Sequence, residues 1–267
     1  MITRTELQII ANREKTALGI LEKDYILTEV LLALSQVSVL RDMLVFKGGT
    51  ALRKIYFPDW RYSEDLDFTV KRDMKDEELL NLVNQWYKVV QERSQIQLTI
   101  KMLHKPGGYA RVRTQYLGPL TYPGMIFMDL SFDEPLCLES ELKKVLAEPF
   151  SESDGMVLVY PLEELLAEKI RSLVERGKSR DYYDVWRILS EQSSKLNMET
   201  LVGVLKNKLT HKGITLNNVD IFLPVDISSL KRYWEQDLAQ QIPKLPSLDQ
   251  VLDELKILLY QLVAPNL

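Results

Sequence analysis

Two short segments near residue 50 carry the residue types that phosphate and metal chemistry require. The first is the glycine pair Gly48-Gly49 followed by Thr50, and the second contains Asp65 and Asp67. Backbone N–H groups at a glycine turn bind anions. Residues two apart in an extended segment face the same side, so both carboxylates are expected on one face, in the arrangement that Mg²⁺ accepts. The two segments together predict a site for a phosphate group and a divalent metal ion.

The apolar residues around these segments predict how they are held. Residues 44–46 form a short apolar run typical of a buried strand, and residues 51–56 have the spacing of a helix. The glycine pair is therefore expected at a strand-to-helix turn. Leu66 and Phe68 alternate with the two aspartates, which predicts a strand whose apolar face points into the core.

The sequence Gly-Gly-Thr-Ala-Leu-Arg at residues 48–53 and the sequence Arg-Tyr-Ser-Glu-Asp-Leu-Asp-Phe at residues 61–68 carry a family resemblance. Together they resemble the signature of the AbiEii/AbiGii toxin family of nucleotidyltransferases, which belongs to the DNA polymerase β-like superfamily. The family supplies toxins of bacterial abortive-infection and toxin–antitoxin systems. Residues 22–27, 129–131 and 162–184 also resemble family positions. Most of residues 1 to about 190 is covered.

The resemblance implies an enzyme that transfers an NMP from an NTP, with two Mg²⁺ or Mn²⁺ ions in its site. It implies that Asp65, Asp67 and Asp129 hold the metal ions, and that Asp129 also helps to activate the acceptor hydroxyl. The implied catalytic residues are Asp65, Asp67, Asp129, Lys169, Asp181 and Asp184. The residues implied in nucleotide and phosphate binding are Gly48, Gly49, Thr50, Ser63, Lys169 and Arg176. Gly-Gly-Thr stands where many superfamily members have Gly-Ser.

Helical spacing independently selects Lys169. In the helix expected from residue 162, this lysine falls on the apolar stripe, and Arg176 lies at the edge of the stripe one heptad later. A buried charge requires a partner, so the lysine either reaches the rim, pairs with Glu64 or another acid, or meets a phosphate. In the next helix Asp181 and Asp184 also share the inward face. Acids in the first turn of a helix commonly stabilise its N-terminus, which is the alternative role of either aspartate.

Other assignments stay open at this point. Asp129 is either the third metal ligand or an edge-strand residue that begins a turn. Thr50 and Ser63 donate to phosphate or serve as turn and cap residues. The aromatic cluster around Tyr182 either stacks on a base or packs in the core, and packing is the more common role.

Composition limits the function classes. The chain has 267 residues, 34 basic against 38 acidic side chains, and a single cysteine, Cys137. The net charge of −4 means that a nucleic-acid site must be a local patch, for which residues 169–180 and the pair Arg111 and Arg113 are candidates. One cysteine excludes an internal disulfide and a cysteine zinc cluster. No apolar run of membrane-spanning length occurs, so we expect a cytoplasmic protein without a membrane partner.

The periodicities predict an α+β fold with the polymerase β-like nucleotidyltransferase core. Two opening helices, a helix over residues 75–92 and alternating runs over residues 96–102, 109–116 and 125–132 predict a small, mostly antiparallel sheet with helices. We expect residues 1–160 to form this core. Residues 161–267 are expected to form a helical domain that completes the active site, with a loop-rich stretch after residue 189 and a final helix over residues 248–263.

Three functions are compatible with this sequence. The first is a toxin that transfers an NMP to an RNA acceptor, with tRNA as the expected acceptor and a cognate antitoxin as a possible partner. The second is a transferase of the same fold that modifies a protein hydroxyl by NMPylation or phosphotransfer. The third is a non-catalytic binding protein, which the set of charged candidates disfavours because charges are expensive to bury without a role. An aspartyl-phosphate phosphatase is disfavoured because the residues before Asp65 are polar.

Overall fold

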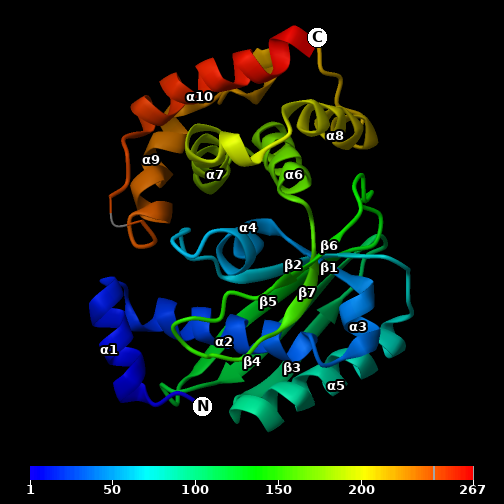
Figure 1. Cartoon of the computed structure of the whole chain (residues 1–267), viewed down its shortest axis with the longest axis vertical. Helices are drawn as coiled ribbons and strands as arrows, with labels where there is room; N and C mark the ends of the chain where they lie inside the picture. Colours follow the sequence, from blue (N-terminus) through cyan, green and yellow to red (C-terminus); the bar gives the residue numbers. More distant parts are fainter. Residues whose placement is uncertain (243, 267) are drawn as a thin grey trace. The chain divides into compact units, whose positions relative to one another are not determined.

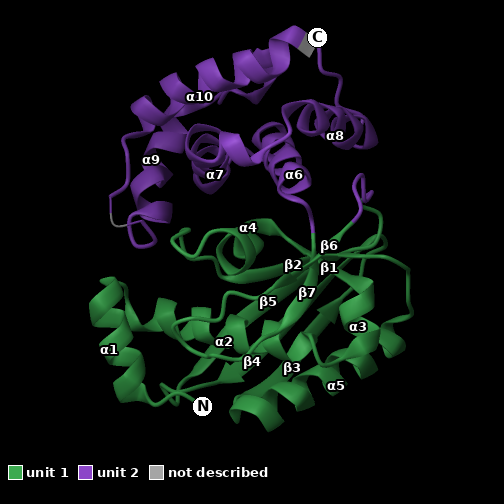
Figure 2. Cartoon of the chain, in the orientation of Figure 1, with its two compact units in different colours: residues 1–134, 140–159 green, residues 135–139, 160–267 purple. Residues whose placement is uncertain are grey.

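The chain divides into two compact units, which Figure 2 distinguishes by colour. The computed structural model describes residues 1–242 and 244–266. Unit 1 comprises Met1–Glu134 and Ser140–Val159, and unit 2 comprises Pro135–Glu139 and Tyr160–Leu267. Unit 1 is built on a sheet, whereas unit 2 is helical.

The strands of unit 1 form one mixed sheet. In the order of the sheet they are β3 (Gln97–His104), β4 (Tyr109–Leu117), β5 (Pro123–Ser131), β2 (Asp65–Val70), β1 (Leu44–Lys47), β7 (Met156–Val159) and β6 (Glu141–Lys144). Two neighbouring pairs, β2 with β5 and β1 with β7, are parallel. The other neighbours are antiparallel. The predicted α+β class with a mostly antiparallel sheet is confirmed.

Three helices of unit 1 pack against this sheet, namely α2 (Leu18–Leu34), α3 (Ser38–Met43) and α5 (Asp76–Ser94), and α1 (Arg4–Glu14) packs against α2. In Figure 1, α2 and α5 run along the sheet. The indole N–H of Trp86 in α5 donates to the carbonyl oxygen of Val30 in α2 at 2.8 Å. The Trp86 ring also meets Phe68 of β2 edge-on, with ring centroids 6.1 Å apart. The apolar face of β2 therefore lies in the core.

A short helical segment follows β1. It consists of α4 (Gly48–Ala51) and a π-helical turn, η1 (Leu52–Tyr56), so the helix begins at the glycines and earlier than the sequence predicts. Its two basic residues point into the core. Nζ of Lys54 lies 2.7 Å from Oδ2 of Asp24, and Nε of Arg53 donates to Oδ1 of the same carboxylate at 3.2 Å. Burial lowers the pKa of Lys54 even though the Asp24 carboxylate opposes this shift.

Unit 2 begins with two buried helices, α6 (Leu162–Glu175) and α7 (Ser179–Glu191). The segment Pro135–Glu139 belongs to this unit, because the N–H groups of Cys137 and Leu138 donate to the buried carboxylate of Glu164. Lys208 completes the cluster. Its Nζ lies 2.8 Å from Oε1 of Glu164 and donates to the carbonyl oxygen of Pro135 at 2.6 Å.

Several elements differ from the sequence prediction. The stretch after residue 189 was predicted to be loop-rich, but it contains two helices, α8 (Met198–His211) and α9 (Ile227–Leu238), before α10 (Leu248–Val263). The prediction missed α8 although its apolar residues, such as Leu201, Leu205 and Leu209, have helical spacing and are buried. The strands β6 and β7 were not predicted. Each is four residues long, too short for alternation to stand out.

Among the described residues, no helix is both long enough and apolar enough to cross a membrane.

Replacing Asp24 with alanine is expected to lower the free energy of unfolding by about 3–5 kcal/mol, because the buried ammonium of Lys54 would lose its counter-ion. Urea denaturation measures this loss. Glu64→Ala is the matched control, since it removes the partner of Lys23 from an ion pair in which Glu64 is 51% exposed. The control should lose less than about 1 kcal/mol. Equal losses in the two variants would contradict the structural role of Asp24.

Candidate active site

The three candidate metal ligands lie on two neighbouring parallel strands. Asp67 of β2 is in register with Asp129 of β5, and Asp65 precedes it by two residues on the same strand. Residues in register on adjacent strands project to the same face, and so do residues two apart on one strand. The structure therefore brings all three carboxylates to one face of the sheet. Leu66 and Phe68 are buried on the opposite face.

Asp129 is held by two side chains of the neighbouring strand β4. Nε of Arg111 donates to Oδ1 and Nη2 donates to Oδ2, each at 2.7 Å, which is a bidentate pair. The hydroxyl of Tyr109 donates to Oδ1 at 2.6 Å. Burial, and next the contact with the Asp129 carboxylate, raise the pKa of Tyr109, so this hydroxyl keeps its proton. Since β5 lies inside the sheet, between β4 and β2, Asp129 is not the edge-strand residue of the alternative interpretation.

Gly48 lies directly against Asp67. Its φ of +78° is in the region that favours glycine. A Cβ atom added to Gly48 would lie 2.2 Å from Oδ2 of Asp67, which is closer than two atoms can approach without displacement. Only glycine therefore allows the turn after β1 to approach this carboxylate.

The second glycine packs against the segment that leads into β2. A Cβ atom added to Gly49 would lie 3.2 Å from Oγ of Ser63 and 3.1 Å from Nη2 of Arg61. The hydroxyl of Thr50 donates to the backbone carbonyl oxygen of Asp65 and is almost fully buried. The glycine turn, Ser63 and the start of β2 are thus gathered in one place. Arg61 is a buried cation at this turn that sequence reasoning did not select.

The remaining candidates cluster in unit 2. Nζ of Lys169 in α6 lies 2.9 Å from Oδ2 of Asp184 and 3.5 Å from Oδ1 of Asp181, both in α7. Arg176 reaches the same acid, donating from Nε to Oδ2 of Asp181 at 2.9 Å and from Nη2 to Oδ1 at 2.8 Å. Lys169 and both acids are buried, as the helical spacing predicts. Glu64, the other partner considered for Lys169, pairs with Lys23 in unit 1.

The charges of this cluster balance locally. Burial disfavours the charged form of Asp181. The Lys169 ammonium and the Arg176 guanidinium outweigh burial and keep the pKa of Asp181 below its usual range. The carboxylate of Asp181 therefore stays ionised between two basic side chains. Tyr182 and Tyr183 in α7 are almost fully buried, which fits packing in the core of unit 2.

The carboxylates on β2 suit a hard divalent cation, because they are oxygen ligands on one face of the sheet. The backbone N–H groups of the adjacent glycine turn suit a phosphate anion. Within residues 1–242 and 244–266, no three His, Cys, Asp or Glu side chains converge closely enough to form a complete metal site. Asp129 has both oxygens bound to Arg111. Asp65 and Asp67 supply carboxylate oxygens that suit a metal ion, and Asp129 fits one only after it exchanges Arg111 for the ion.

The Arg111 and Tyr109 contacts are the part of the site that sequence reasoning missed. A signal was present, because Tyr109, Arg111 and Arg113 alternate along one strand that a Pro-Gly-Gly turn precedes. Arg111 was considered only as part of a basic patch. In the antiparallel pairing of β4 and β5 it lies opposite Asp129, which gives it a specific partner.

Comparisons with known proteins agree with this geometry. A protein-family model described as "Nucleotidyl transferase AbiEii toxin, Type IV TA system" matches residues 30–254. Among solved structures the chain is similar to MenT4, a nucleotidyltransferase toxin from Mycobacterium tuberculosis, with 20% sequence identity and a TM-score of 0.62. That match covers 98% of this chain and 99% of the other, and at this identity it shows a shared fold. No curated protein sequence matches the chain.

Alanine at Gly48 is expected to destabilise unit 1 more than alanine at Gly107. Both positions have positive φ, which costs alanine about 1–2 kcal/mol. Only the Gly48 variant also pushes a methyl group into the Asp67 carboxylate, since no atom lies within 4 Å of the same position on Gly107. We expect an additional loss of about 1–3 kcal/mol in the free energy of unfolding, measured with urea. Losses that agree between the two variants would show that Gly48 does not contact Asp67.

Proposed function

Because the chain belongs to the AbiEii family of nucleotidyltransferase toxins of type IV toxin–antitoxin systems, we propose that it transfers an NMP from an NTP to an RNA acceptor. The proposed acceptor is a tRNA, and the reaction would inhibit growth or phage propagation. One observation carries the proposal. Asp67 and Asp129 lie in register on β2 and β5, with Asp65 on the same face and Gly48 packed against Asp67.

The proposed roles in unit 1 follow from this placement. Asp65 and Asp67 hold a divalent cation, Mg²⁺ or Mn²⁺, and Asp129 joins them when Arg111 releases it. When bound, two such ions would supply charge neutralisation and a more nucleophilic acceptor oxygen. The backbone N–H groups at Gly48 and Gly49 bind the phosphates, and Ser63 adjoins the turn. The Thr50 hydroxyl already donates to Asp65, so this residue supports the proposed site by holding β2 against the glycine turn.

The proposed roles in unit 2 rest on charge. Lys169 and Arg176 are the cations that contact NTP phosphates, because point charges and forked guanidinium groups stabilise phosphate anions. Asp181 and Asp184 contact Lys169 and fix the position of its Nζ. We propose that the carboxylates of unit 1 and the cations of unit 2 serve one reaction. The expectation that the helical unit completes the active site remains a prediction.

The family also suggests a protein partner. Type IV toxin–antitoxin systems pair a toxin with an antitoxin, and we propose that this chain has a cognate antitoxin that relieves its effect on growth. Co-expression of the cognate antitoxin should restore growth that expression of the chain alone arrests.

Transfer of labelled NMP tests the activity directly. Purified protein is incubated with Mg²⁺, each α-labelled NTP in turn, and total tRNA or total protein. Label in the tRNA is expected, because the proposed reaction links the α-phosphate to RNA. Asp65→Asn should reduce labelling at least about a hundredfold, since it removes the charge that holds the metal ion.

Glu64→Gln is the matched control for Asp65→Asn. Glu64 is adjacent in sequence and half exposed, so labelling should stay within about twofold of the unaltered chain. Label in the protein fraction would show that the acceptor is a protein hydroxyl and not an RNA. Absence of label in both fractions, with every NTP, would refute the proposed transfer.

Arg111→Gln is expected to strengthen binding of Mn²⁺ in the absence of nucleotide. A charged hydrogen bond is worth about 1.5–3 kcal/mol, and Arg111 is 45% exposed, so we expect a gain of at most about tenfold. Titration followed by electron paramagnetic resonance measures the affinity. Arg113→Gln is the control, because Arg113 is on the same strand as Arg111 but lies opposite Phe127 of β5 and not opposite a carboxylate. Identical affinities in all three proteins would show that Arg111 does not compete with the metal ion.

A further inference from the structure

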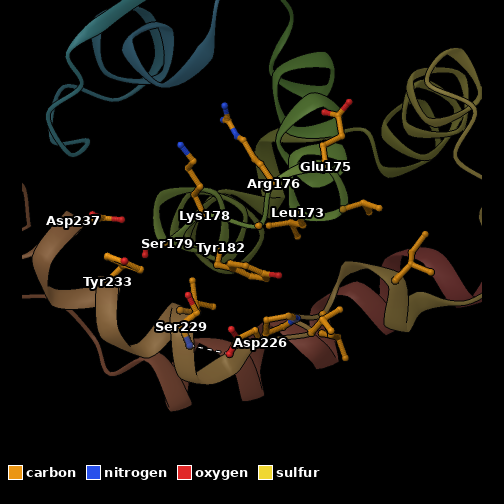
Figure 3. A pocket seen from close by; sticks show the side chains of 17 residues that line it. Leu173, Glu175, Arg176, Lys178, Ser179, Tyr182, Asp226, Ser229, Tyr233 and Asp237 are labelled. Atoms are coloured by element: carbon orange, nitrogen blue, oxygen red, sulfur yellow. Dashed lines mark hydrogen bonds between the residues drawn. The ribbon is translucent and has the colours of Figure 1, made fainter.

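Unit 2 contains a groove whose role the proposed reaction does not explain. Its cavity volume is about 640 Å³, and it lies between the start of α7 and the helix α9 (Figure 3). Residues from both helices line it, among them Ser179 and Tyr182 of α7 and Ser229, Tyr233 and Asp237 of α9. The groove is large enough for a nucleotide-sized ligand.

One buried polar side chain of the groove, Ser179, has no hydrogen-bond partner among the described residues. Ser179 is 1% exposed, and its hydroxyl makes no hydrogen bond within the part of the chain that the structure describes. In Figure 3 the Ser179 oxygen lies on the side of α7 toward Tyr233. A buried hydroxyl without a partner is unfavourable, and native structures rarely contain one without a reason. A ligand that accepts a hydrogen bond from Ser179 would provide that reason.

The backbone around Ser179 favours an anion. Ser179 is the first residue of α7, a helix of 13 residues, and the N-cap residue Lys178 makes no side-chain hydrogen bond to the first turn. The first N–H groups of a helix have no partners within it, and the helix dipole places partial positive charge there. Ser179 therefore adds a hydroxyl donor to a helix N-terminus that has no side-chain cap. Phosphate is the anion that such N-termini commonly bind.

Two of the acidic side chains in the groove form hydrogen bonds within the protein, and a third suits the ribose or base of a nucleotide. Asp226 accepts a hydrogen bond from the N–H of Ser229 at 2.9 Å and so caps α9. Glu175 accepts one from Nε of Arg171 at 3.2 Å. Asp237 is exposed, and its carboxylate is an acceptor for a ribose hydroxyl or a base amino group. The ring of Tyr233 is 43% exposed and offers a stacking surface.

We propose that this groove binds the phosphate of a nucleotide at the N-terminus of α7, with Ser179 donating to the phosphate and Tyr233 beside the nucleoside. The phosphate belongs either to the NTP or to the RNA acceptor. The choice between these sources rests on the proposed function, whereas phosphate binding itself does not. The groove adjoins the Lys169 cluster, since Arg176 lines the groove, whereas Lys169, Asp181 and Asp184 do not.

Binding of inorganic phosphate to the full chain tests the site. Calorimetric titration should show that Ser179→Ala weakens phosphate binding about tenfold, a change of about 1.4 kcal/mol. Ser190→Ala is the matched control, because Ser190 is an exposed serine of the same helix whose hydroxyl donates to the carbonyl oxygen of Trp186. The control should bind phosphate like the unaltered chain. Equal affinity of the Ser179 variant, or no phosphate binding by the unaltered chain, would overturn the proposal.

The urea midpoint of the same variant is a second, independent measurement. Removal of a hydroxyl without a partner should leave the midpoint unchanged or raise it, because no hydrogen bond is lost. A lowered midpoint would mean that Ser179 has a structural partner, and it would also count against the proposal. This pair of readouts separates a binding role from a structural one.

Two further titrations identify the source of the phosphate. A non-hydrolysable analogue of each NTP and a single-stranded RNA hexamer are titrated into the unaltered chain, Ser179→Ala and Tyr233→Ala. Weaker binding of the analogues alone assigns the groove to the NTP, and weaker binding of the hexamer alone assigns it to the acceptor. Unchanged binding of both ligands would overturn the nucleotide assignment. Phosphate binding by an unaltered chain that shows no transfer activity would refute the proposed function and leave this site intact.

Discussion

The position of β2 inside the sheet is the constraint on which the candidate site of unit 1 depends. One face of this strand is apolar, and Phe68 packs against Phe46 of β1 and Trp86 of α5. Because side chains alternate along a strand, burial of that face forces Asp65 and Asp67 onto the other one. A shift of one residue in register would bury the carboxylates and expose the apolar residues. The hydrophobic core thus fixes where the charged residues lie.

Buried ion pairs are the second feature on which the structure depends, and those of Lys54 and Lys169 have different roles. Lys54 and Lys169 are both buried and each contacts aspartate. The Lys54 pair lies among the large side chains of the core of unit 1, and we assign it to stability. The Lys169 cluster contains two acids and a second cation, Arg176, which is 44% exposed. That partial exposure leaves one cation of the cluster accessible to a phosphate, which suits binding better than stability alone.

Arg111 and Ser179 show two different states of a polar side chain in a proposed binding site. Arg111 neutralises Asp129 in a bidentate pair, so that this carboxylate is not left without a counter-charge. Ser179 is the opposite case, since its buried hydroxyl has no hydrogen-bond partner among the described residues, which lowers stability, and a ligand that accepts a hydrogen bond from it would remove this cost. Functional sites commonly carry such locally unfavourable groups, which the rest of the fold compensates.

The sequence alone determined the family, the fold class and which charged residues share one face of a strand or a helix. Alternation was sufficient for Asp65 and Asp67, and helical spacing was sufficient for Lys169, Asp181 and Asp184, because both periodicities are local. Only the tertiary structure decided which charges meet. The bidentate pairing of Arg111 with Asp129, the contact of Gly48 with Asp67 and the missing partner of Ser179 depend on strand register and helix packing. These arise from residues far apart in the chain, and no local pattern encodes them.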